Sequence, residues 1–169
     1  MPSENTTYIN YLIEISKTGR QRGFLDLCDI ILPNVYTVVF RLVNDTDLAK
    51  RITSKTLVDA WGEMKDFDIR QPFVNWIKNA AVLHSIDELA KNPALFQTSI
   101  EKSIKNPEAK DLESLIKSLP PLSRIIFVLH DLEGYSYTEI AKFFPEFIED
   151  ELKTNLIQTR QYLIGSIVQ

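Results

Sequence analysis

Apolar side chains recur three or four positions apart along most of this chain, a spacing that gathers them on one face of an α-helix. Glycine occurs only five times in 169 residues, and apolar residues make up 44 % of the chain. This composition is rich enough for a packed core and is not that of a disordered tail. The pattern therefore predicts an all-α fold and disfavours a strand-rich sandwich.

The same periodicity divides the first half of the chain into four predicted helices, at about residues 8–15, 24–43, 48–64 and 72–89. Pro33 lies inside the second and is expected to kink it or split it in two. The turn at 44–47 can cap the third helix, and Pro72 suits the first turn of the fourth. Periodicity is then lost, with one short helical turn expected near Leu95 and Phe96. We therefore expect two small helical domains, 1–91 and 110–169, joined by a linker at 92–109.

The second predicted domain contains a helix-turn-helix pattern. An apolar helix from Arg124 to Leu132 is closed by Gly134, as glycine often closes helices. Ser136 and Glu139 have the spacing of a capping box at the start of a short helix. A turn then leads to a last helix at about 150–164. Two such helices joined by a turn are typical of a DNA-reading motif, although an ordinary helical hairpin that only packs a core is the alternative.

In a helix-turn-helix the second helix lies in the major groove of DNA, so its outward side chains read the bases. Asparagine and glutamine can pair with adenine, and arginine with guanine. On the last predicted helix we expect the outward side chains to be Lys153, Thr154, Asn155, Gln158, Thr159, Arg160 and Gln161.

The overall charge weakens the expectation of DNA binding. The formal net charge is −4 and the pI is about 5.2, whereas proteins that bind duplex DNA usually carry a basic surface. Glu149, Asp150 and Glu151 start the last helix, where they offset its macrodipole but also repel phosphates. An acidic chain often acts through a protein partner.

Other chemistry finds little support in the sequence. The single cysteine, Cys28, has no disulfide partner and lies in an apolar run, so we expect a small buried side chain. We see no phosphate-binding glycine loop and no metal-ligand spacing, and neither His84 nor His130 has an evident catalytic partner. We therefore expect no enzyme, no cofactor, no metal and no small-molecule substrate. Without a signal-like segment or an apolar run of about 20 residues, we expect a cytoplasmic protein that does not bind membranes.

One long segment carries a family resemblance. Residues 119–141 read LPPLSRIIFVLHDLEGYSYTEIA, which resembles the start of the promoter-reading C-terminal domain of extracytoplasmic-function sigma factors. The first half resembles the other domain of that family, since its motifs occur in the family's order and spacing at 32–36, 57–61, 67–68, 72–77 and 85–89. Together the likeness covers about residues 8–91 and 110–165.

The resemblance implies a transcription initiation factor that directs core RNA polymerase to promoter DNA and can be held by an anti-sigma factor. The first domain would bind the polymerase clamp and melt the minus-ten element, and the second would read the minus-thirty-five element. Polymerase contacts are then expected at Lys50, Arg51, Ser54, Lys55 and Asp59. Minus-ten contacts are expected at Lys78, Asn79 and His84. Trp61 and Trp76 could stack on bases, although their helical spacing favours a place in the core.

The sequence departs from the family at these very positions. Basic residues stand on the third helix where the family is typically acidic, and Ala81, Val82 and Leu83 replace a polar triplet on the fourth. The last helix retains only Lys153 and Arg160 as basic residues. Like charges across an interface cost affinity. The alternative is therefore a sigma-like regulator that has lost promoter binding and acts by protein–protein interaction, sequestering an anti-sigma factor.

Overall fold

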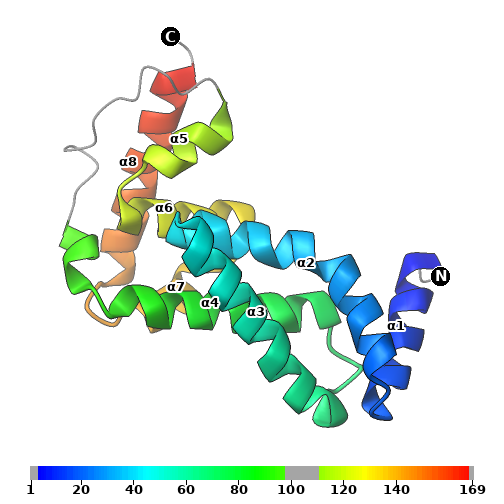
Figure 1. Ribbon diagram of the computed structural model, residues 1–169. Coiled ribbons are helices and arrows are strands. Elements are labelled where there is room, and N and C mark those ends of the chain that lie inside the picture. The colour runs from blue at the N-terminus through cyan, green and yellow to red at the C-terminus, as the bar shows by residue number, and fades with distance from the viewer. Residues whose placement is uncertain (1–3, 98–110, 168–169) are drawn as a thin grey trace. The chain divides into compact units, whose positions relative to one another are not determined.

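In the computed structural model, which describes residues 4–97 and 111–167, every regular element is helical (Figure 1). This confirms the predicted all-α fold. The longer helices are α1 (Glu4–Lys17), α2 (Gln21–Val43), α3 (Thr46–Glu63), α4 (Phe73–Ala90), α5 (Leu112–Ser118), α6 (Pro121–Phe127), α7 (Tyr137–Phe143) and α8 (Glu149–Ile167). Short 3-10 turns lie at Met64–Asp66 (η1) and Pro93–Gln97 (η2), and a π-helical turn lies at Val128–Leu132 (η4).

The chain forms two compact units. The first comprises Met1–Phe40 and Asp45–Ser85, and the second Arg41–Asn44 and Ile86–Gln169. The expected domain limits at 91 and 110 remain a prediction, because most of the expected linker lies outside the described residues. The helical turn expected near Leu95 and Phe96 is present as η2, and the Phe96 ring packs edge-on against Phe144 with 5.5 Å between centroids.

The central helix of the first unit is α2, which runs unbroken through Pro33. Of the two outcomes expected at Pro33, a kink or a split, the split is therefore excluded. Leu27, Ile31, Val35 and Val39 are completely buried along one face of α2. Burial on both sides of the proline offsets the roughly 3 kcal/mol that an internal proline costs a helix. By length and composition α2 could also cross a membrane, with 39 % of its most apolar window buried, but a core helix of a soluble protein passes the same test.

The third and fourth helices begin as the sequence predicts. The Asp45 side chain accepts a hydrogen bond from the Leu48 N–H at 2.7 Å and caps α3. The Pro72 carbonyl accepts from the Trp76 N–H at 3.1 Å at the start of α4. Both tryptophans pack on phenylalanine rings: Trp61 on Phe24 at 5.1 Å, and Trp76 on Phe67 at 4.8 Å. These contacts place the two indoles at the edge of the core.

The second unit is built around α6 and η4, whose residues Leu122 to Leu129 are all buried. The sequence predicts one continuous helix here, whereas the α-helix widens into a π-helical turn at Val128. Gly134 then ends it with a φ of 78°, a conformation that glycine adopts without strain, as expected. Against α6 packs α8, which buries Leu152, Leu156 and Leu163. This packing fixes the orientation of α8.

Candidate nucleic-acid interface

The predicted helix-turn-helix is formed by α7, a short turn and α8 (Figure 1). Its capping box is complete: the Ser136 hydroxyl accepts from the Glu139 N–H at 3.2 Å, and a Glu139 carboxylate oxygen accepts from the Ser136 N–H at 2.8 Å. The Thr138 hydroxyl also donates to Glu149 at 2.8 Å, which ties the start of α7 to the start of α8. The two helices are therefore locked together at their N-terminal ends.

The outward face of α8 agrees with the prediction except at one residue. Thr154, Gln158, Arg160 and Gln161 are exposed, and Lys153 and Asn155 are partly exposed. Thr159, by contrast, is 0 % exposed, and its hydroxyl donates to the Asn155 carbonyl at 2.8 Å. The assignment of Thr159 to DNA is wrong because position 159 falls on the buried stripe of residues 152, 156 and 163, with spacings of three and four.

Both basic residues of α8 are paired with carboxylates. Arg160 donates from Nε to Asp131 Oδ2 at 2.8 Å and from Nη2 to Asp131 Oδ1 at 2.5 Å. The hydrogen bond from Arg160 is the main reason why the pKa of Asp131 lies below its usual value. The Lys153 ammonium lies 3.3 Å from Asp150 and 4.0 Å from Glu149. Neither cation therefore presents an uncompensated charge to a ligand.

The start of α8 is acidic and already satisfied by its own side chains. A Glu151 carboxylate oxygen accepts from the Ile148 N–H at 3.0 Å. A groove of about 390 Å³ runs along this end and is lined by Leu122, Ile126, Phe147, Asp150, Glu151, Leu152, Thr154, Asn155 and Gln158. Helix N-termini commonly bind phosphates. Here a phosphate would meet carboxylates first, whereas Asn155 and Gln158 further along α8 carry neutral amides.

On α3, the residues expected at the polymerase are on the surface: Lys50, Arg51, Ser54 and Lys55 are exposed, and Asp59 is partly exposed. Lys55 forms an ion pair with Asp59 one turn later. The hydrogen bond from Lys55 is the main reason why the pKa of Asp59 lies below its usual value. Lys50 and Ser54 also border a cavity of about 420 Å³ together with Leu32, Pro33, Tyr36 and Thr53.

On α4, Asn79 is exposed, and Lys78 and His84 are partly exposed. His84 has the acidic partner that the sequence did not reveal: its Nε2 lies 3.3 Å from Asp59. Its Nδ1 lies 3.0 Å from the Thr56 hydroxyl, which donates its own proton to the Ile52 carbonyl at 2.8 Å. The structure thus joins an expected polymerase residue to an expected minus-ten residue.

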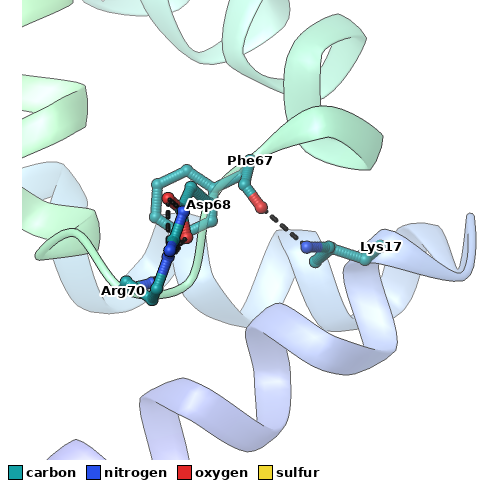
Figure 2. A network of polar contacts seen from close by, with 4 residues as sticks. All are labelled: Lys17, Phe67, Asp68 and Arg70. Atoms are coloured by element: carbon teal, nitrogen blue, oxygen red, sulfur yellow. Dashed lines mark hydrogen bonds and ion pairs between the residues drawn. The ribbon is translucent and has the colours of Figure 1, made fainter.

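The loop between α3 and α4 is held by a network of hydrogen bonds (Figure 2). The Lys17 ammonium at the end of α1 donates to the Phe67 carbonyl at 2.6 Å. Asp68 accepts from Arg70 through its backbone N–H at 3.0 Å and its guanidinium Nη2 at 2.7 Å. These hydrogen bonds hold the pKa of Asp68 below its usual value. The loop is therefore pre-organised where it meets α4.

The described residues give no support for a metal site or for a reactive cysteine. Among them, no group of three or more histidine, cysteine, aspartate or glutamate side chains could hold a metal ion. Cys28 is half-buried, and burial raises the pKa of its thiol to about 11. A thiol with so high a pKa is a poor nucleophile at neutral pH.

Comparison with known proteins agrees with this geometry. The family model described as "Sigma-70, region 4" matches residues 109–144. A curated relative, the ECF RNA polymerase sigma factor SigW of Bacillus subtilis (strain 168), is 28 % identical over 75 residues, which are 44 % of this chain and 40 % of the relative. The match thus spans less than half the length of that relative.

Two solved structures share the fold. CnrH, determined in complex with the cytosolic domain of CnrY, gives a TM-score of 0.56 at 19 % identity and covers 94 % of this chain and 96 % of its own. The sigma factor RpoE, determined with the anti-sigma factor NepR from Bartonella quintana, gives 0.56 at 18 % identity, with 85 % and 96 % covered. These two structural alignments cover most of the chain, including the first unit. Residues 109–144 are therefore similar to sigma-70 region 4, and the chain shares the fold of these two structures.

Proposed function

We propose that this chain is a cytoplasmic, non-catalytic RNA polymerase sigma factor of the extracytoplasmic-function type, which directs core polymerase to promoters. The observation that carries the proposal is the helix-turn-helix within and directly after the sigma-70 region 4 match, with Asn155 and Gln158 on the outer face of α8. Amides of this kind pair with adenine in the major groove.

The proposed roles of the two units follow from that assignment. In the second unit, α8 reads the minus-thirty-five element through Lys153, Thr154, Asn155 and Gln158. In the first unit, α4 contacts the minus-ten strand near Lys78, Asn79 and His84, and α3 meets the polymerase clamp through Lys50, Arg51, Ser54, Lys55 and Asp59. An anti-sigma factor is a proposed further partner, because the structural neighbour RpoE was determined with one. The alternative of a sigma-like regulator without promoter binding is not favoured, since the curated relative and this neighbour are both named as sigma factors.

Reconstituted transcription tests the proposal. The full chain is mixed with core RNA polymerase from its own organism and with a promoter library, and complex formation and selective transcripts are both measured. We expect a stable complex and transcription from a subset of promoters. Failure to bind core polymerase at low salt overturns the proposal.

A substitution on the reading helix sharpens this test. Gln158→Ala should leave binding to core polymerase unchanged and relax promoter selection at one base position, since a bidentate base contact contributes about 1–3 kcal/mol of discrimination. Ile157→Ala, at an exposed neighbouring position, is the matched control. Equal promoter selection by both variants and the wild type would show that α8 does not read bases at Gln158.

A further inference from the structure

On α8, the helix proposed to read DNA, the arginine side chain is engaged in an ion pair with another element of the second unit. Arg160 on α8 and Asp131 on η4 form a two-pronged pair, with parallel hydrogen bonds of 2.8 and 2.5 Å. The Asp131 side chain is only 19 % exposed, whereas that of Arg160 is 44 % exposed. A bidentate arginine–carboxylate pair is stronger and more directional than an ordinary surface ion pair.

Asp131 is held in place independently of Arg160. It lies in the π-helical turn η4, and His130 Nδ1 contacts its Oδ1 at 2.8 Å. The His130 ring packs in turn on the Tyr137 ring at 4.4 Å between centroids. Because its own element and a second donor fix the carboxylate, Arg160 is drawn toward a preformed anion.

Asp131 occupies the Nε and Nη2 donors of Arg160, an edge that a guanine or a phosphate can also use. Lys153 is paired less firmly, through single contacts at 3.3 and 4.0 Å. A duplex that approaches α8 therefore meets Arg160 in a two-pronged pair and Lys153 in longer contacts with Asp150 and Glu149. Since non-specific affinity comes from phosphate neutralisation, the Asp131 contact removes part of that affinity and leaves the neutral amides of α8 in place.

We infer that Asp131 limits the affinity of α8 for DNA of any sequence, because it competes with the DNA for Arg160. This inference rests on the proposed function, because it requires that α8 meets a duplex. It predicts that the wild-type chain gains little from Arg160 in binding DNA, and that removing the Asp131 charge releases Arg160 to bind phosphate.

The inference is tested by measuring how tightly the full chain binds a random-sequence duplex. Fluorescence anisotropy reports the binding at each salt concentration of a series. Asp131→Asn keeps the shape of the side chain and removes its charge. We expect it to tighten binding and to steepen the slope of log K against log salt by about 0.9, one additional phosphate contact. Between 50 and 200 mM salt, the variant should then lose about threefold more affinity than the wild type.

Two further variants separate release of Arg160 from a general gain of positive charge. Glu133→Gln removes a carboxylate two residues away and should tighten binding less than Asp131→Asn does. Asp131→Asn combined with Arg160→Gln should bind more tightly than Arg160→Gln alone by no more than Glu133→Gln gains over the wild type. Asp131→Ser repeats the neutralisation with a different side chain, and thermal melts of each variant verify that α8 remains folded.

Two outcomes overturn the inference. In one, Asp131→Asn weakens binding and Arg160→Gln weakens it equally, which would mean that Asp131 positions an arginine that already contacts DNA. In the other, no variant binds any duplex. That second result leaves the proposed function standing as long as the chain still binds core polymerase, so failure of the inference and failure of the proposal are distinguishable.

Discussion

The two units carry opposite charge patterns on the helices proposed to meet their ligands. On α3 of the first unit, Lys50 and Arg51 are exposed, and neither has an ion pair among the described residues. On α8 of the second unit, three carboxylates occupy the first turn and both cations are paired. The sigma-factor resemblance implies the reverse, with acidic residues on α3 and basic residues on α8.

This difference separates the residues that build the fold from those proposed to meet ligands. The positions that match the family in Leu119 to Ala141 are largely buried or form caps, and they build the same helices. Most positions that depart from it are at least partly exposed, where substitutions seldom change stability by more than about 0.5 kcal/mol, although Ala81 and Val82 on α4 are buried. The surface could therefore change charge while the helix-turn-helix was retained.

The largest expected effect is a loss of stability when a buried side chain of the helix-turn-helix is removed. Leu156→Ala removes a completely buried side chain from α8 and should lower the free energy of unfolding by about 2–5 kcal/mol, because it leaves a cavity. Urea denaturation measures the change. Ile157→Ala, next to it and exposed, should cost less than about 0.5 kcal/mol. Equal losses would mean that α8 is not packed as the structure shows.

The capping box should have the next largest effect. Ser136→Ala removes the hydroxyl that accepts from the Glu139 N–H and should cost about 0.5–2 kcal/mol of stability. Thermal unfolding followed by circular dichroism checks this. Ser136→Thr keeps a hydroxyl and should recover most of the loss. If the wild type, Ser136→Ala and Ser136→Thr all unfold at the same temperature, the cap does not stabilise the fold.

The ion pair between Arg160 on α8 and Asp131 predicts that the stability of the fold depends on pH. Hydrogen bonding from Arg160 lowers the folded-state pKa of Asp131, so the pair stabilises the fold above the usual aspartate pKa and loses that contribution as pH falls through the lower, folded value. At pH 7 we expect Arg160→Gln to cost at most about 1 kcal/mol, since the pair is partly exposed.

Urea denaturation at neutral pH and at about pH 2.5 measures this difference. At the lower pH, the wild type and Arg160→Gln should approach equal stability. A gap that is the same at both pH values would mean that Asp131 and Arg160 do not interact in solution.

The smallest expected effect concerns the unpaired cations of α3. Lys50→Glu should weaken binding to the chain's own core polymerase about two- to fivefold, mainly through the association rate, because exposed interface charges steer encounter. Surface plasmon resonance at two salt concentrations measures it. Lys65→Glu, an exposed reversal on η1, is the matched control. Tighter binding by Lys50→Glu would indicate that the clamp has kept the family's basic surface.

Much of the architecture could be predicted from local signals. The capping box at Ser136 and Glu139, the Asp45 cap and the closing Gly134 all act within a few residues, so the sequence alone identifies them. Pro33 is the exception, because its helix persists through burial against the rest of the first unit. The π-helical turn at Val128 carried no signal that we could recognise.

Which polar side chains of the candidate site remain available to a ligand was less predictable, because this depends on partners distant in the sequence. Thr159 is predicted on the outward face of the last helix, although the stripe of residues 152, 156 and 163 places it in the core. Arg160 is neutralised by Asp131, from another element, and His84 on α4 is joined to Asp59 on α3. No spacing rule connects these pairs.

The sequence by itself determined the helices, their caps and the helix-turn-helix, since these depend on periodicity and on contacts within one or two turns. Only the tertiary structure decided which polar groups of those helices remain available to a ligand. The physical reason is that an exposed charge is neutralised by whatever opposite charge the packing brings within about 4 Å, and packing is a property of the whole fold.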